Sequence, residues 1–510
     1  MESSIIIWFV ALPILAAFLI PVIGIVVNGF QRIFTSFIML ALSGLSVFAL
    51  LRDAGMQTYI VGGWEPVEGV PIAIYMVLDG LSGFLLVIIN LLGLFSAFYA
   101  ISYIKRYTGE NLFYTLMCLM IAGMNGVVLS GDLFNLYVFL EISVISSYAL
   151  VAFGVEKTEL EASYKYQVLG GLASLLVLFG IAMLYWRTGT LNIADTAMLL
   201  AGARQDAFLV FVQLILITGF GIKAALIPFH AWLPDAHSSA PSPISAMLSG
   251  VLIKAVGVYV IIRLFFNMFQ PETPLAVVIT VIGALSMVVG VLLAIGQWDL
   301  KRLLAYHSIS QMGYVVIGVG MGMIVLAGDG DRAVAALAIG GGLFHMINHA
   351  VFKGLLFLNA GAIEYAVGTR DMKKMGGLAK YMPVTLGSSF SASMAISGMP
   401  PFNGFFSKLV IIVAAVKGGF YLLASLAVIA GIITLASFMK FQRYAFYEKS
   451  PGSTNAKEVP ATMCISMISL AILCLALSLL IFPGIREIFL GPAVNTLVEM
   501  TEYATKILNL

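Results

Sequence analysis

The stretch GIKAALIPFHAWLPDAHSSAPSPISAMLSGVLIKAVGVY, residues 221–259, decides how this chain folds. It contains two apolar runs, each with one lysine (Lys223 and Lys254), and Pro228 interrupts the first run. Proline inside a helix removes a backbone hydrogen bond and breaks the helix. At membrane depth such a break persists only where it is buried in protein or lines a water-filled cavity. The stretch therefore predicts an interrupted membrane helix followed by a second helix, with both lysines inside the protein.

The composition extends this prediction to the whole chain. Of 510 residues, 61% are hydrophobic and 10% are charged, whereas soluble domains carry about 25% charge. The net charge of +2 gives no reason to expect nucleic-acid binding. Three cysteines at irregular spacing predict neither a disulfide framework nor a metal site. We expect an all-α, polytopic membrane protein.

Fourteen stretches are long and apolar enough to form membrane helices, which need about 20 mostly apolar residues. They are residues 5–27, 33–51, 74–102, 112–130, 133–154, 162–186, 208–230, 241–266, 275–297, 303–327, 333–363, 383–416, 420–439 and 461–483. No basic segment precedes the first stretch, so we expect a retained helix and no cleaved signal peptide. A second interruption is predicted at Pro400 and Pro401, in SGMPPFNGFFSKL. Asp79 is expected to organise a helix end.

Lysines and arginines between these stretches predict the orientation. One side of the membrane receives fifteen of them and the other receives eight, with Lys301 counted on the first side and Arg263 on the second. Cytoplasmic loops carry the excess of basic residues. We therefore expect a protein of the cell membrane with both termini outside.

The four remaining lysines, Lys223, Lys254, Lys353 and Lys408, lie inside predicted spans, as does Glu141. A charge at the bilayer centre costs about 3 kcal/mol, so such residues are kept where they are paired, hydrated or used. Each of the two interruptions has one of these lysines beside it. Paired interrupted segments five spans apart, and so of opposite orientation, indicate a transport site.

Histidines add to this set. In HMINHAVFK, His345, His349 and Lys353 are spaced at i, i+4 and i+8, which places them on one helix face. His307 lies in another span, and His230 and His237 flank the first interruption; these three are further candidates for a relay. Burial lowers the pKa of a lysine and pairing with a carboxylate raises it, so a row of such groups suits proton transfer.

Simpler interpretations exist for several of these residues. Glu141 and Lys223 could form only a structural ion pair, and Lys254 could extend its ammonium group to the membrane surface (snorkel) or bond a backbone carbonyl. His307 could cap a helix or bond locally, and His237 could be an interfacial histidine. Two histidines at i, i+4 bind zinc in metalloproteases, but the glutamate of that motif is absent here, so we expect no metal.

Five motifs resemble a known family: SGDLFNLYVFLEIS, the stretch 221–259, DLKRLLAYHSISQMGY, HMINHAVFKGLLFLNAG and GMPPFNGFFSK. They are similar to the antiporter-like subunits of complex I. They are still more similar to the D-type subunits of Mrp cation/proton antiporters and to their counterparts in membrane-bound hydrogenases and related complexes. The resemblance runs from about residue 70 to 445. Only about 27 residues follow Pro483, too few for the long lateral helix of one complex I subunit type.

The resemblance implies two inverted five-helix repeats with helices 7 and 12 broken. Residues 1–107 would form the N-terminal helices, 108–267 the first repeat, 270–447 the second, and 448–510 a C-terminal helix and tail. It further implies a proton path through the buried residues Glu141, Lys223, Lys254, His345, His349, Lys353 and Lys408. His307 departs from the family pattern, in which a small hydroxyl residue is common.

The resemblance implies that the chain is a proton-translocating, antiporter-like subunit of a multisubunit membrane complex. Whether H⁺ is exchanged for Na⁺ is left open. Two energy sources are left open. One is an existing ion gradient, which an antiporter uses. The other is a redox reaction in a complex of hydrogenase, sulfane reductase or NADH dehydrogenase type with a peripheral iron–sulfur arm. The chain itself has no haem pair, iron–sulfur cysteine pattern or nucleotide-binding glycine loop, so we expect no cofactor in it. The alternatives are a small-solute channel, and a quinone-site or structural subunit without its own ion path.

Overall fold

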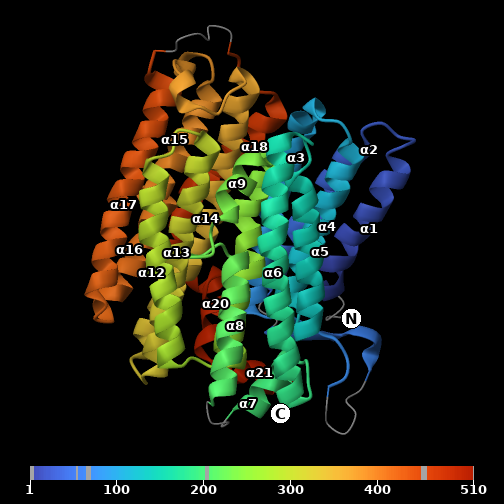
Figure 1. The fold of residues 1–510 in the computed structure, drawn as a ribbon, viewed down its shortest axis with the longest axis vertical. Coiled ribbons are helices and arrows are strands. Elements are labelled where there is room, and N and C mark those ends of the chain that lie inside the picture. Colours follow the sequence, from blue (N-terminus) through green and yellow to red (C-terminus); the bar gives the residue numbers. More distant parts are fainter. Residues whose placement is uncertain (1–4, 53–54, 65–70, 202–205, 450–455, 509–510) are drawn as a thin grey trace.

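A computed structural model describes residues 5–52, 55–64, 71–201, 206–449 and 456–508. These residues form a bundle of long helices, with α1 and α2 at one edge and α16 and α17 at the other (Figure 1). Twelve helices in the described residues are long and apolar enough to cross a membrane. Two interrupted helices bring this number to the predicted fourteen, and the all-α polytopic fold is confirmed.

The helices before the first interruption follow the predicted spans closely. They are α1 (Ile5–Ile23), α2 (Phe30–Leu51), α3 (Gly80–Tyr103), α4 (Glu110–Leu129), α5 (Leu133–Val151) and α6 (Lys157–Thr188). The short α7 (Ile193–Leu200) follows α6 and was not predicted. One departure is a hairpin of β1 (Gln57–Ile60) and β2 (Tyr75–Leu78), whose strands pair antiparallel with Gln57 opposite Leu78. The third span was predicted from residue 74. It begins at Gly80 because the carboxylate of Asp79 accepts the backbone N–H of Ser82 and caps the helix.

The first interruption separates α8 (Ala207–Lys223) from α9 (Trp232–Ser239), and the second separates α15 (Pro383–Ser397) from α16 (Asn403–Lys417). In Figure 1, α8 lies below α9 and α15 lies above α16, so each pair together spans the bundle. The backbone turns through left-handed conformations at Ala225 and at Gly398. Both predicted interruptions are confirmed, and residues 383–416, predicted as one interrupted span, form two half-helices.

The span from Ser242 to Met268 is entirely buried and irregular. It consists of α10 (Ser242–Met247), α11 (Tyr259–Arg263) and three π-helical turns, η4 (Leu248–Leu252), η5 (Lys254–Val258) and η6 (Leu264–Met268). Gly257 packs directly on the first interruption, since a Cβ there would lie 2.6 Å from the Cβ of Ala224. The wider π-helical turns were not predicted, and they bring this span against the end of α8.

The second half continues with α12 (Thr273–Ile295), α13 (Leu300–Ala327), α14 (Arg332–Val367), α17 (Tyr421–Gln442) and α18 (Ala461–Ala476). After α18, where a tail was predicted, the short helices α19 (Pro483–Phe489), α20 (Gly491–Val498) and α21 (Met500–Leu508) follow. In Figure 1, α20 and α21 lie in the lower half of the bundle, with α21 beside α7.

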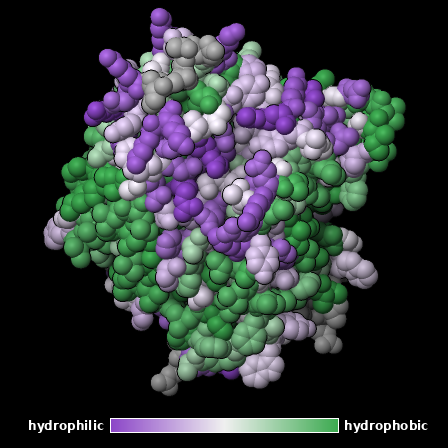
Figure 2. All heavy atoms as spheres, turned by 45° about the horizontal axis from the view of Figure 1, so that its top comes forward, coloured by the Kyte–Doolittle hydropathy of each residue, from purple (hydrophilic) through white to green (hydrophobic). Residues whose placement is uncertain are grey.

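Hydrophilic side chains gather at the upper end of the bundle, and hydrophobic side chains cover its flanks (Figure 2). This arrangement suits a protein whose flanks face lipid. Two basic residues counted as loop residues are in fact buried: the side chains of Arg263 and Lys301 are each only 2% exposed. Their burial corrects the loop count, because tertiary contacts cover these ends of the helices.

Candidate functional site

Three helices bring Glu141, Ser174 and Lys223 together at the first interruption. The Lys223 Nζ lies 3.8 Å from the Glu141 carboxylate and donates a hydrogen bond of 2.8 Å to the Ser174 hydroxyl. The Ser174 hydroxyl donates in turn to the Glu141 carboxylate, so the serine bridges the pair. Ser174 was not predicted from the sequence, and its one signal is a small polar residue within the apolar run of α6.

Lys254 is fully buried in η5 and has a different environment. Its ammonium group donates to the carbonyl oxygens of Ser249, at 3.0 Å, and Gly250. These carbonyls belong to the preceding π-helical turn, where the wider helix leaves them within reach. The carbonyl-bonded interpretation therefore describes the contacts of Lys254, and no carboxylate among the described residues pairs with it.

The histidine face of α14 is fully buried, as the spacing predicts. The His345 ring lies between two side chains from neighbouring helices, with its Nδ1 3.0 Å from the Ser407 hydroxyl and its Nε2 3.1 Å from the Gln311 amide oxygen. Lys353, two turns further along, donates to the carbonyl oxygen of Leu304. Within the described part of the chain, the ring nitrogens of His349 have no hydrogen-bond partner.

Lys408 lies beyond the second interruption and reaches back across it. Its ammonium group donates to the carbonyl oxygen of Ile396 at 2.7 Å, in the last turn of α15. The ring of Tyr314 lies under it, 4.8 Å from the Nζ to the ring centroid. Since Ser407 precedes Lys408, the hydrogen bond from His345 connects α14 directly to this segment.

The three further histidine candidates differ in burial. His237 and His307 are fully buried, each beside an aromatic ring, Phe357 and Phe438 respectively. His230 is half-buried near Tyr306. Neither ring nitrogen of His237 or of His307 has a hydrogen-bond partner in the described residues, so the local bonding considered for His307 is not seen. The full burial of His237 differs from the interfacial position considered for it.

The structure thus joins some predicted residues directly and leaves others apart. Direct contacts connect Glu141 with Lys223, and His345 with the segment of Lys408. Among the residues that the structure describes, no hydrogen bond or ion pair joins Lys223 to Lys254, or Lys254 to Lys353. A transfer along the row therefore requires movement of side chains or water at these two steps.

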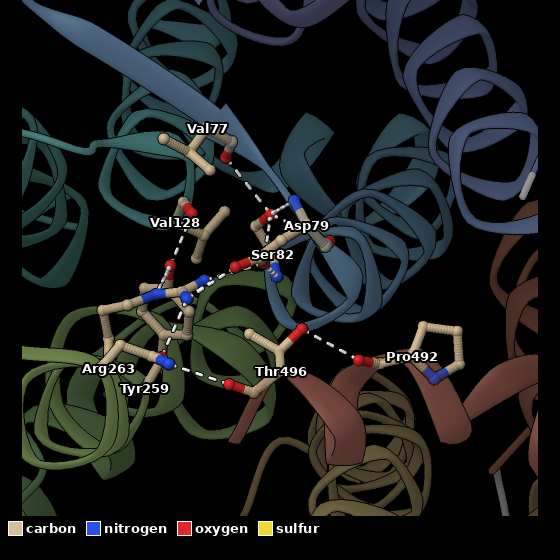
Figure 3. A network of polar contacts seen from close by, with 9 residues as sticks. Val77, Asp79, Ser82, Val128, Tyr259, Arg263, Pro492 and Thr496 are labelled. Atoms are coloured by element: carbon tan, nitrogen blue, oxygen red, sulfur yellow. Dashed lines mark hydrogen bonds and ion pairs between the residues drawn. The ribbon is translucent and has the colours of Figure 1, made fainter. Parts of the chain in front are cut away.

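A second buried ion pair was not predicted. The two terminal nitrogens of Arg263 lie 2.6 and 2.8 Å from the two carboxylate oxygens of Asp79, at the start of α3. Figure 3 shows the guanidinium pointing at Asp79 and Ser82, with Tyr259 beside it. The ring of Tyr503, in α21, lies 4.8 Å from the guanidinium carbon. The pair therefore ties α3, the irregular span and the C-terminal helices together.

Comparisons with known proteins agree with this architecture. A family model described as "NADH:quinone oxidoreductase/Mrp antiporter, TM" matches residues 130–434. The chain is 35% identical to the D-type Na(+)/H(+) antiporter subunit of Alkalihalophilus pseudofirmus, over 86% of this chain and 87% of the relative. It is 36% identical to the N-type NADH-quinone oxidoreductase subunit of Desulforudis audaxviator, over 79% and 78% of the two chains. A chain in the structure of the Mrp complex from Dietzia sp. superposes with a TM-score of 0.87 and 27% identity, covering 99% of each chain.

Proposed function

The chain belongs to the NADH:quinone oxidoreductase/Mrp antiporter family of membrane proteins, and we propose that protons cross it along the buried row from Glu141 to Lys408. It is an antiporter-like membrane subunit, and its relatives and structural neighbours come from multisubunit membrane complexes. The contact of Glu141, Ser174 and Lys223 carries the proposal. A buried lysine beside a carboxylate and a hydroxyl can hold or release a proton as the pairing changes.

The path begins at the end of the bundle that holds the basic loops, which we place on the cytoplasmic side with both termini outside. Protons reach Lys223 near the first interruption. They pass by way of Lys254, water and the histidine face of α14 to Lys408, which releases them to the opposite side. Glu141 controls Lys223 by pairing with it, and the Ser174 hydroxyl, which accepts from Lys223 and donates to Glu141, links the two groups.

A neighbouring membrane subunit covers Glu141 in this proposal. The Glu141 side chain is 25% exposed although α5 is a membrane helix. Its neighbours along the helix, Val138 and Ile145, are exposed apolar side chains. An ionised carboxylate facing lipid is costly, so a second subunit lying on α5 would shield it. Movement of charge in that subunit would then act directly on the pair of Glu141 and Lys223.

The coupling of proton movement is a further part of the proposal. Exchange of H⁺ for Na⁺ is one form of it. The other is a redox-driven complex in which a peripheral iron–sulfur arm supplies the energy. In both, any cofactor belongs to partner subunits, and this chain supplies the ion path alone. Purification of the chain with its partners discriminates between the two, since only a redox-driven complex copurifies with a nickel–iron or iron–sulfur subunit.

Alanine variants in the assembled complex test the path. We expect Glu141→Ala and Lys223→Ala to lower the initial rate of proton movement into vesicles at least tenfold. The matched control is Glu161→Ala, which removes the glutamate of an exposed pair with Lys165 and should leave the rate unchanged. Full pumping by normally assembled Glu141→Ala and Lys223→Ala variants would refute the relay and favour a structural or quinone-site subunit.

A further inference from the structure

A polar cavity of about 710 Å³ opens at the end of the bundle that carries the basic loops. Its lining comes from the ends of α9 and α14, the segments that follow α3, α5 and α14, and the starts of α6 and α13. Eight of its residues are charged and converge from different elements: Arg106, Glu156, Glu159, Asp299, Lys301, Glu364, Arg370 and Asp371. None of them belongs to the proposed relay.

Two cations and one carboxylate close the inner end of this cavity. The Lys301 ammonium group, almost fully buried, lies 3.1 Å from the Glu364 carboxylate and donates to the carbonyl oxygen of Ala240 at 3.1 Å. The Arg370 guanidinium donates to the carbonyl oxygen of Ser238, and its Nε lies 3.8 Å from Glu364. Both carbonyls stand at the C-terminal end of α9, a position that favours cations. Glu364 thus bridges two side chains that cap the helix carrying His237.

Glu364 also lies on the same face of α14 as the relay. It follows Lys353 by 11 residues, which is close to three helical turns and places the two on one face about 16 Å apart. Phe357 occupies this face between them. The His237 ring, from α9, lies 5.7 Å from the Phe357 ring, and the Lys353 Nζ lies 5.8 Å from the same ring. His237 therefore stands at the level where the polar face of α14 is interrupted.

We infer that the cavity is a proton-uptake vestibule and that Glu364 is its first proton acceptor, with His237 as the next station. This inference rests on the proposed function. A hydronium ion in the cavity gives its proton to the Glu364 carboxylate, which loosens the contacts with Lys301 and Arg370 and leaves water behind. Glu364 then passes the proton through water to a ring nitrogen of His237 and becomes a carboxylate again. The imidazolium gives it to Lys353 in its neutral form, so this proton joins the histidine face of α14 by an entry separate from the one at Lys223.

The other charged groups around Glu364 fit this role. Lys301 at the start of α13, Arg370 after α14 and Arg106 after α3 are positive, and Asp299 lies beside Arg370 at 3.4 Å. The three cations stabilise the carboxylate form of Glu364, so the resting site is unprotonated. Protonation removes the only negative partner that Lys301 has among the described residues.

The test measures the initial rate of proton movement by the reconstituted complex as the pH on the basic-loop side is varied. Glu364→Gln should raise the proton concentration for half-maximal rate at least tenfold, while the maximal rate stays within twofold because the later relay is intact. Glu364→Asp should give a smaller rise. The matched control is Glu161→Gln, an exposed glutamate at the same end of α6 outside the cavity, which should change neither quantity.

Two results would overturn the vestibule. An unchanged half-maximal proton concentration in Glu364→Gln means that protons arrive elsewhere. A fall in maximal rate alone means that Glu364 only stabilises the end of α9. If Glu364→Gln does not assemble, Glu364→Asp decides by the same criterion. Glu141→Ala, measured in parallel, separates a failure of the relay from a failure of the vestibule. Retained proton transport in Glu141→Ala refutes the relay itself. Loss of transport in Glu141→Ala, with no change of the half-maximal proton concentration in Glu364→Gln, refutes only the vestibule.

Discussion

Replacing Asp79 with asparagine would separate the two tasks of this carboxylate. Asp79 caps α3 through the backbone N–H of Ser82 and also pairs with Arg263 through two short hydrogen bonds. Asparagine is as good a helix cap as aspartate, so the substitution keeps the cap. It removes the negative charge and leaves the guanidinium of Arg263 buried without a counter-ion, because both side chains are only 2% exposed.

The size of the effect follows from this burial. Removing one partner of a buried ion pair costs about 3–5 kcal/mol. Unfolding entropy is roughly 2.1 cal/mol/K per residue, so the 510 residues of this chain give about 1.1 kcal/mol/K. Asp79→Asn should therefore lower the midpoint of thermal unfolding by about 3–5 °C. The double variant Asp79→Asn with Arg263→Met removes both charges and should regain part of this loss.

The matched control is Asp206→Asn. Asp206 also caps a helix, α8, and also pairs with an arginine, Arg187 at 3.4 Å, but this pair is about half exposed. Exposed pairs contribute about 0–1 kcal/mol, so its midpoint should fall by less than about 1 °C. Thermal unfolding of the purified complex in detergent, followed by tryptophan fluorescence, measures both. Equal shifts for the two variants would refute the argument that burial sets the strength of the Asp79–Arg263 pair.

Three further outcomes follow from single contacts. Ser174→Ala removes the hydroxyl between Glu141 and Lys223. Because hydrogen bonds to charged groups contribute about 1.5–3 kcal/mol, the rate of proton movement into vesicles should fall roughly tenfold or more. An unchanged rate would show that the direct contact of Glu141 and Lys223 suffices. Gly257→Ala would place a Cβ 2.6 Å from Ala224 and should destabilise the complex to heat, whereas Gly171→Ala, which meets nothing within 4 Å, should not; equal stability would contradict the close packing. A membrane-impermeant maleimide should label Lys374→Cys only from the cytoplasmic side and Lys417→Cys only from outside, and the reverse would invert the proposed orientation.

Much of the fold could be predicted because membrane helices leave a strong signal. Each span is a run of apolar residues of fixed minimum length, and proline marks both interruptions. The lysines of the row were found for a related reason, since Lys223 and Lys408 each stand beside one of those prolines. The division into two inverted repeats stays a prediction.

Features that depend on tertiary contacts could not be predicted. The burial of Arg263 and Lys301 is decided by the C-terminal helices and by α14, which lie far from them in sequence. The π-helical turns around Lys254 leave no periodic signal in a uniformly apolar run. Ser174 was missed because a single serine in a membrane helix usually bonds its own backbone, and Ser174 also makes that bond, to the carbonyl of Gly170.

The breaks and distortions of the helices supply counter-charge where side chains do not. Lys408 and Lys254 have no carboxylate partner among the described residues, and each ammonium group bonds carbonyl oxygens instead. For Lys408 the acceptor is the carbonyl oxygen of Ile396, in the last turn of α15, where a helix end carries about half a negative charge. Lys223, the last residue of α8, stands at the same kind of helix end and has Glu141 in addition. An unbroken helix would offer Lys223 and Lys408 no such end, so the interruptions create the places where the row of buried residues can hold a cation.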